Sequence, residues 1–165
     1  MSINKLVYLC LIILTITITF NKNFANNIEE MNNNLIRPEY LKAGDTIAIV
    51  APSGILNDHQ NYIDKAKNLL EDWGLNVVIG ENIYNNYGHF SGTDEERTND
   101  FQKALDDNTI SAIWCARGGY GAMRIIDNLD YSEYIKNPKW IIGYSDITAI
   151  HNDLNILGSE SIHSI

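Results

Sequence analysis

The stretch Gly143-Tyr-Ser-Asp146 places a serine between an apolar, strand-like run and a helix-like one. A serine on such a turn projects its hydroxyl at the amino end of a helix, where backbone N–H groups and the helix dipole stabilise negative charge. This context is typical of a nucleophile elbow, although Ile147 stands where a second glycine is usual. Serine and aspartate are also common helix caps, so Asp146 has a purely structural interpretation as well. The motif alone leaves both interpretations open.

A serine nucleophile needs a general base, usually a histidine that a carboxylate orients. His151 follows Ser145 by six residues in the same predicted helix, so at 100° per residue it points about 240° away from the serine. His59 begins a predicted helix, His89 lies in a predicted loop, and His163 lies near the last residue of the sequence. None of the four histidines is positioned convincingly, and the triad looks incomplete.

A glycine-rich turn, Arg117-Gly-Gly-Tyr-Gly121, follows another apolar run. Paired glycines after a strand can expose backbone N–H groups to a developing oxyanion. The turn lacks the lysine and serine of a P-loop and the spacing of a dinucleotide-binding motif, so a phosphate site is not predicted. A tight turn that needs positive φ is the structural alternative.

Metal and cysteine chemistry are not predicted. The histidines and the cysteines show no spacing typical of metal ligands, so neither a metal site nor a cofactor is expected. Cys115 lies in a predicted strand, where a lone cysteine is more often buried and inert than nucleophilic.

The elements that must position these residues follow a regular alternation. Strands are predicted at residues 46–50, 75–79, 112–115 and 140–142, each followed by a helical pattern. Repeated strand–helix units predict an α/β fold with an open, mainly parallel sheet and helices on both faces. In such sheets ligands bind beyond the carboxyl ends of the strands. Four segments qualify by position: 51–54, the region near His89, 117–121 and 143–146.

Each predicted helix has an apolar face. The second begins with a capping box in which Thr93 and Glu96 satisfy each other's backbone N–H groups. The expected apolar faces, in chain order, are Tyr62, Ala66, Leu69 and Trp73, ended by Gly74; Phe101, Ala104 and Leu105; Met123, Ile126 and Leu129; and Ile147, Ile150, Leu154 and Leu157.

The first 25 residues are predicted to be a secretory signal peptide, followed by a linker over residues 26–36. One lysine precedes an apolar run of 15 residues, which is short for a membrane span of about 20. Cleavage would remove two lysines and no acids, taking the net charge from −9 to −11. Such an acidic, exported and periplasmic domain is not expected to bind nucleic acid.

Five segments, in order and spacing, resemble the LD-carboxypeptidase family, which comprises muramoyl-tetrapeptide carboxypeptidases and microcin-immunity serine peptidases. The resemblance covers residues 37–165. Its segments are Arg37-Pro-x-Tyr-Leu-Lys-x-Gly-Asp45, Ile49-Val-Ala-Pro-Ser-Gly54, Phe90-Ser-Gly-Thr-Asp-Glu-Glu-Arg97, Ala112-Ile-Trp-Cys-Ala-Arg-Gly-Gly-Tyr-Gly-Ala-Met-Arg124 and Ile142-Gly-Tyr-Ser-Asp-Ile-Thr-Ala149.

The resemblance implies a serine peptidase that removes the terminal D-alanine at the L,D bond of a murein tetrapeptide. Ser145 matches the family's nucleophile. The backbone N–H of Asp146, with that of Gly118 or Gly119, would form the oxyanion hole. Which of the two glycines supplies the second donor stays open.

Family members are considerably longer, and their triad glutamate and histidine lie in a second, carboxy-terminal domain. The chain is therefore expected to be the amino-terminal domain of such an enzyme, truncated or split, and inactive unless a separate half supplies Glu and His. A non-catalytic exported module that binds cell-wall peptides and a decaying gene product are the alternatives. A homodimer is left open.

Overall fold

The computed structural model describes residues 14–23, 35–56 and 60–164. The chain divides into two units, residues 1–35 and 36–165. In the first unit, residues 14–23 are helical, and no helix among the described residues is long and apolar enough to cross a membrane. The remainder of the predicted signal peptide, residues 24–34 and His59 lie outside the described residues, so the signal peptide and the linker stay predictions.

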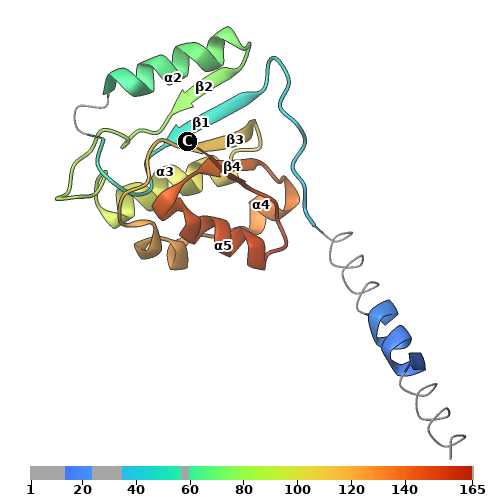
Figure 1. Cartoon of the computed structure of the whole chain (residues 1–165). Helices are drawn as coiled ribbons and strands as arrows, with labels where there is room; N and C mark the ends of the chain where they lie inside the picture. Colours follow the sequence, from blue (N-terminus) through green and yellow to red (C-terminus); the bar gives the residue numbers. More distant parts are fainter. Residues whose placement is uncertain (1–13, 24–34, 57–59, 165) are drawn as a thin grey trace, which may run out of the picture. The chain divides into compact units, whose positions relative to one another are not determined.

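The second unit is built on a five-stranded, wholly parallel sheet in the order β2-β1-β3-β4-β5 (Figure 1). Its strands are β1 (Thr46–Val50), β2 (Asn76–Ile79), β3 (Ile110–Cys115), β4 (Trp140–Gly143) and β5 (Ile162–His163). Four of them confirm the predicted strands within two residues. The fifth strand, β5, was not predicted; it has two residues and is held by its pairing with β4.

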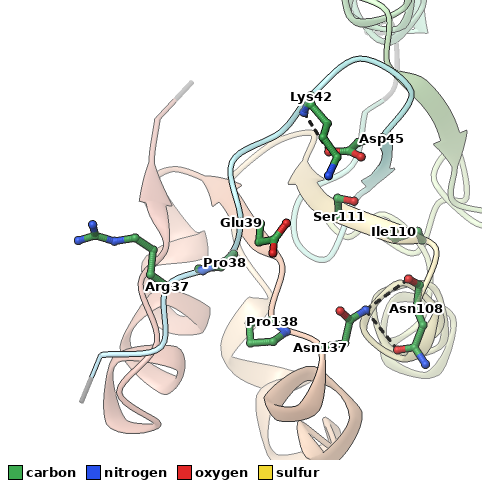
Figure 2. A pocket seen from close by; sticks show the side chains of 10 residues that line it. All are labelled: Arg37, Pro38, Glu39, Lys42, Asp45, Asn108, Ile110, Ser111, Asn137 and Pro138. Atoms are coloured by element: carbon green, nitrogen blue, oxygen red, sulfur yellow. Dashed lines mark hydrogen bonds between the residues drawn. The ribbon is translucent and has the colours of Figure 1, made fainter. Parts of the chain in front are cut away.

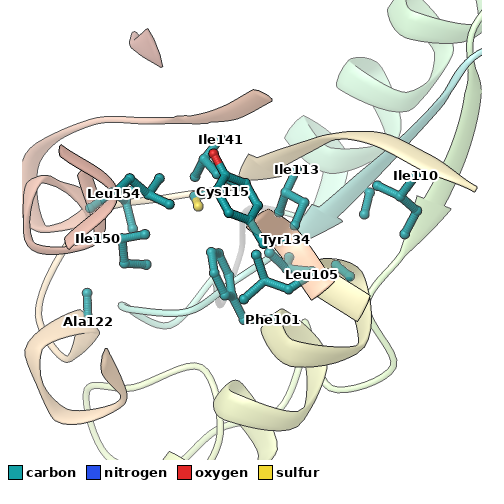
Figure 3. Close-up of a cluster of buried hydrophobic side chains, with 14 residues drawn as sticks. Phe101, Leu105, Ile110, Ile113, Cys115, Ala122, Tyr134, Ile141, Ile150 and Leu154 are labelled. Carbon is teal, nitrogen blue, oxygen red and sulfur yellow. The ribbon is translucent and has the colours of Figure 1, made fainter. Parts of the chain in front are cut away.

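Helices cover both faces of the sheet, as predicted. One face packs against α3 (Asp94–Asp106), α4 (Ser132–Lys136) and α5 (Thr148–Ile156), and the other packs against α2 (Gln60–Asp72). Figure 3 shows the first of these cores, where strand side chains such as Ile113, Cys115 and Ile141 meet Phe101 and Leu105 of α3. All five are fully buried.

Two of the predicted helix faces are confirmed. The α3 helix begins with the expected capping box, in which Glu96 N–H donates to Thr93 Oγ1 and the Glu96 carboxylate accepts from Thr93 N–H. Its predicted apolar residues are buried. So are Ile147, Ile150 and Leu154 of the last helical segment, whereas Leu157 is half-buried. Gly74 ends α2 with a positive φ of 84°.

The predicted face of α2 is wrong in its register. Tyr62 and Trp73 are 63% and 64% exposed and Leu69 is exposed too, whereas Ile63 and Leu70 are buried. The two stripes lie one residue apart with the same seven-residue spacing, so periodicity alone could not choose between them. The aliphatic stripe faces the sheet.

The helix predicted after Gly121 is wrong as well. The chain forms two short 3-10 helices there, η2 (Ala122–Arg124) and η3 (Ile126–Asn128), followed by α4. Met123 is exposed, whereas Ala122 and Ile125 are fully buried. Their three-residue spacing fits a helix with three residues per turn.

Candidate active site

Ser145 lies on a strained turn between β4 and η4 (Ser145–Ile147), the short 3-10 helix that leads into α5. Its φ is +57°, the only positive value of a non-glycine residue in the described part of the chain, and its side chain is exposed. The left-handed conformation costs an L-residue about 1 kcal/mol or more. Such strain persists where the surroundings impose it, typically at functional sites.

Residues on both sides of Ser145 impose this turn. A Cβ atom on Gly143 would lie 2.8 Å from Ile147 Cγ2 and 3.1 Å from Cys115 Cβ, so only glycine fits. Ile147, at the position of the missing second glycine, is fully buried. The buried Ile147 side chain therefore holds the start of the helix against the core while Ser145 faces outwards.

The predicted glycine-rich turn lies directly against Ser145. A Cβ atom on Gly118 would lie 2.8 Å from Ser145 Cβ and 3.2 Å from Ser145 Oγ. The Gly118 carbonyl in turn accepts a hydrogen bond of 3.1 Å from Gly54 N–H. The region near His89 joins them, because Ser91 N–H donates 3.1 Å to the Ser53 carbonyl. All four segments predicted to lie at the carboxyl ends of the strands thus pack on one another.

Backbone donors beside Ser145 have no acceptor among the described residues. These are the N–H groups of Gly118, Gly119 and Asp146. Carbonyl and N–H point in opposite directions in a trans peptide, so the Gly119 N–H points away from Gly54, to which the Gly118 carbonyl is bonded. Free N–H groups on two turns beside one hydroxyl are what an oxyanion site requires.

The Asp146 side chain is not a helix cap. Its Oδ2 accepts 2.5 Å from Ser53 Oγ and 2.8 Å from Ala122 N–H, and no side chain caps η4 or α5. The carboxylate therefore ties the turn after β1 to the residue that follows the glycine-rich turn. Ser53 is fully buried. Its role was missed, although its place directly after a buried strand was a usable signal.

Arg97 is a second link that sequence reasoning missed. The residue is 2% exposed, and Nη1 donates to the carbonyls of Pro52 (2.7 Å) and Gly121 (2.9 Å). Burial lowers the Arg97 pKa, and the neighbouring Asp94 opposes that shift. Hydrogen bonds from Arg124, with further help from Arg97, lower the Asp94 pKa. The paired arginine joins the turns after β1 and β3.

The histidines among the described residues are not directed at Ser145. His151 Nε2 lies 3.1 Å from the Gly143 carbonyl and Nδ1 lies 2.8 Å from Ser161 Oγ. Because a carbonyl only accepts, Nε2 carries the proton in the neutral ring. Burial lowers the His151 pKa. His163 is exposed on β5, and His89 is exposed in the loop before Phe90. In the described part of the chain, no hydrogen bond joins a histidine to Ser145.

Two hollows lie at opposite ends of the sheet. Figure 2 shows the larger one, of about 270 Å³, at the amino ends of the strands, where Asn137 is hydrogen-bonded to Asn108. The other, of about 230 Å³, lies beside the glycine-rich turn at the carboxyl ends. It is lined by Gly54, Ile55, His89, Arg117, Gly119 and Tyr120. Two of its lining residues, Gly54 and Gly119, lie next to Gly118, which packs against Ser145.

Other chemistries find little support among the described residues. No three His, Cys, Asp or Glu side chains there are grouped so that they could hold a metal ion. Cys115 is fully buried, and its burial raises the thiol pKa far above the ordinary value. A thiolate nucleophile at Cys115 is therefore disfavoured, as its strand position predicted.

Comparison with known proteins gives one consistent group. The family profile described as LD-carboxypeptidase N-terminal domain matches residues 47–164. A murein tetrapeptide carboxypeptidase of Pseudomonas aeruginosa is 32% identical over 119 residues, which are 71% of this chain and 38% of that protein.

Solved structures agree with the sequence relatives. The microcin C7 self immunity protein MccF, in complex with aspartyl sulfamoyl adenosine, gives a TM-score of 0.68 at 30% identity, covering 75% of this chain and 37% of that one. Muramoyltetrapeptide carboxypeptidase from Oxalobacter formigenes gives 0.61 at 28% identity, covering 70% and 38%. The chain spans 37–44% of the length of the first curated relatives that it matches.

Proposed function

The chain belongs to the LD-carboxypeptidase family, and we propose that Ser145 is the nucleophile of a serine-type site that removes the terminal D-alanine at the L,D bond of a murein tetrapeptide. The observation that carries this proposal is the strained, exposed Ser145 packed against Gly118. The relative from Pseudomonas aeruginosa, named a murein tetrapeptide carboxypeptidase, supports the substrate class.

In the proposed reaction, Ser145 Oγ attacks the carbonyl carbon of the last peptide bond while a base takes its proton. The backbone N–H of Asp146, with that of Gly118 or Gly119, stabilises the oxyanion; the peptide geometry favours Gly119. When the intermediate collapses, the base returns the proton to the leaving amine and D-alanine departs. Water then cleaves the acyl–Ser145 ester and releases the shortened peptide.

The base and its orienting carboxylate are proposed to come from a second domain, on this or another polypeptide. This proposal is supported by the orientation of His151, whose two ring nitrogens are engaged with Gly143 and Ser161. It is also supported by the greater length of the relatives. Without the base, Ser145 should react slowly, since loss of one triad member removes most of the rate enhancement.

Labelling by a fluorophosphonate, located by mass spectrometry, tests the nucleophile. We expect labelling at Ser145 that is slow for the chain alone and much faster when the carboxy-terminal domain of a full-length relative is added. Release of D-alanine from a murein tetrapeptide should follow the same order, and Ser145→Ala should abolish both. Hydrolysis that survives in Ser145→Ala, beside a mock purification without activity, would remove Ser145 from the mechanism.

A binding module without catalysis is the second candidate. It is favoured by the lack of a hydrogen bond between any described histidine and Ser145. Saturable tetrapeptide binding by the chain, together with no labelling and no D-alanine release after addition of the second domain, would support it. Absence of saturable binding would exclude it.

Export to the periplasm is part of the proposal and rests on the pattern of the first 25 residues. Expression of the full chain in a Gram-negative host should yield a protein that begins at Asn26 in the periplasmic fraction. An intact amino terminus at Met1 in the cytosolic fraction would contradict it.

A further inference from the structure

Arg117 differs from the other arginines of the chain in its partners. All four arginines lie in the described residues, and Arg117 is the one with no carboxylate partner there. The others form ion pairs: Arg37 with Glu160, and Arg97 and Arg124 with Asp94. In a chain of net charge −9, an arginine that no acid neutralises is available for an anionic ligand.

The position of the Arg117 side chain is fixed by backbone. Its Nη1 donates 2.7 Å to the carbonyl of Ile55, and the N–H of Ile55 donates 3.1 Å to the carbonyl of His89. The guanidinium is thus held at the junction of two loops and is half-buried. A guanidinium has five N–H donors, and one of them makes this bond.

The Arg117 side chain, with its remaining N–H donors, lines the cavity of about 230 Å³ beside the glycine-rich turn. This cavity adjoins the candidate active site through shared residues. Gly54 and Gly119 line it, and Gly54 is also bonded to Gly118, the residue that contacts Ser145. Arg117 itself directly precedes Gly118.

We propose that Arg117 is the specificity residue that binds the terminal carboxylate of the substrate peptide. The inference rests on the proposed function and names the group that defines the substrate end. In a carboxypeptidase substrate the terminal carboxylate belongs to the residue that follows the attacked carbonyl, at most about 3.6 Å further along the chain. A residue that binds this carboxylate must therefore lie beside the oxyanion donors. The planar guanidinium of Arg117 suits bidentate binding of a carboxylate.

Equilibrium binding of two matched peptides tests the proposal. The probes are L-Ala-γ-D-Glu-L-Lys-D-Ala with a free terminal carboxylate and the same peptide with a terminal carboxamide. They are titrated by calorimetry against the chain carrying Ser145→Ala, so that no acyl-enzyme forms. We expect the acid to bind at least about tenfold more tightly than the amide. The preference should shrink with added salt.

Variants then assign the preference. In Arg117→Gln the acid should bind no better than the amide, with affinity for the amide within about twofold of the parent. Arg117→Lys should keep part of the preference, because it keeps the charge without the fork. Arg37→Gln, at the other end of the sheet, should keep all of it. Binding of the amide reports in the same experiment that each variant is folded.

In Arg117→Gln, a persistent preference for the acid, or an equal loss of affinity for both peptides, would overturn the proposal. So would a parent chain that binds the two peptides equally well or binds neither. These outcomes differ from failure of the proposed function. Labelling and cleavage at Ser145 without an acid preference would leave the function standing and remove the subsite. An Arg117-dependent preference without labelling or cleavage would do the reverse.

Discussion

The two ends of the parallel sheet use glycine for different reasons. At the amino ends, Gly44 has a φ of +94° and a Cβ atom there would meet nothing within 4 Å, so this glycine serves only the shape of a turn. At the carboxyl ends, Gly118 lies against Ser145 and Gly54 lies against the Gly118 carbonyl. The larger cavity belongs to the amino ends. Close backbone packing beside a strained serine, rather than the size of a hollow, marks the candidate site.

The largest effect is expected from alanine at the packed glycine. Gly118→Ala would place its Cβ 2.8 Å from Ser145 Cβ, so either the serine or the oxyanion turn must move. Loss of an oxyanion donor costs about 10²- to 10³-fold in rate in comparable enzymes. We expect a loss of that order in fluorophosphonate labelling of Ser145, measured in the presence of the second domain.

Gly44→Ala is the matched control at the amino end. Its strained φ should lower the free energy of unfolding by about 1 kcal/mol, with labelling of Ser145 unchanged. If both variants slowed labelling equally, the contrast between the two ends would be wrong and general destabilisation would explain the result.

Two buried cations extend the comparison. Arg97, at the carboxyl ends, donates to Pro52 and Gly121 on two different turns. Lys139, directly before β4, donates to the carbonyls of Ala104, in the last turn of α3, and Asp107, its C-cap. Both side chains are fully or nearly fully buried, but only the first connects segments that reach Ser145.

Arg97→Met and Lys139→Met should therefore separate stability from reactivity. In each variant one carbonyl, that of Pro52 or of Ala104, loses its donor, whereas the other keeps a backbone N–H, from Arg124 to Gly121 or from Ile110 to Asp107. Both variants should therefore lose about 1–3 kcal/mol of unfolding free energy in urea titrations. We expect labelling of Ser145, compared at a temperature where each variant is fully folded, to fall about tenfold or more only in Arg97→Met. Equal losses of labelling would show that Arg97 has no special role in positioning the turns.

The sequence predicted those features that depend on local pattern. Four strands, the capping box at Thr93 and the turn at Ser145 each have a signal within a few residues. The register of α2 was predicted wrongly because Tyr62 and Ile63 begin equivalent stripes, and the sheet chooses between them. The hydrogen bonds of Ser53 and Arg97 could not be predicted from local pattern either, because the tertiary fold brings the partners together. Those partners, Asp146 and Gly121, lie 93 and 24 residues away in the sequence.

A smaller effect is expected at Ser53. Ser53→Ala removes one of the two donors to the Asp146 carboxylate, while Ala122 N–H still donates to the same oxygen. We expect a loss of about 1 kcal/mol in unfolding free energy and a decrease of a few-fold in labelling of Ser145. Ser111→Ala, in the cavity at the amino ends, should change neither beyond error. If Ser53→Ala changed neither the unfolding free energy nor the labelling of Ser145, Ala122 N–H alone would be sufficient to hold the Asp146 carboxylate.

The smallest effect concerns pH and His151, which lies behind the turn at Ser145. Burial lowers its pKa in the folded chain, the hydrogen bond to Gly143 opposes this, and nearby His163 adds to the lowering. The unfolded chain takes up the proton near pH 6.5 and the folded chain only at lower pH. Between these values the unfolded state binds more protons, so stability rises with pH and falls as the pH drops below about 6.5. The carboxylates Asp94 and Glu96, whose pKa values are lowered by hydrogen bonds, lose their contribution to stability only in more acidic solution.

Urea titrations at pH 7.5 and 5.5 should thus show a small decrease in unfolding free energy at the lower pH. The variant His151→Gln should reduce this decrease, because an amide can donate to the Gly143 carbonyl without titrating. An equal decrease in the variant would place the titrating group elsewhere in the chain.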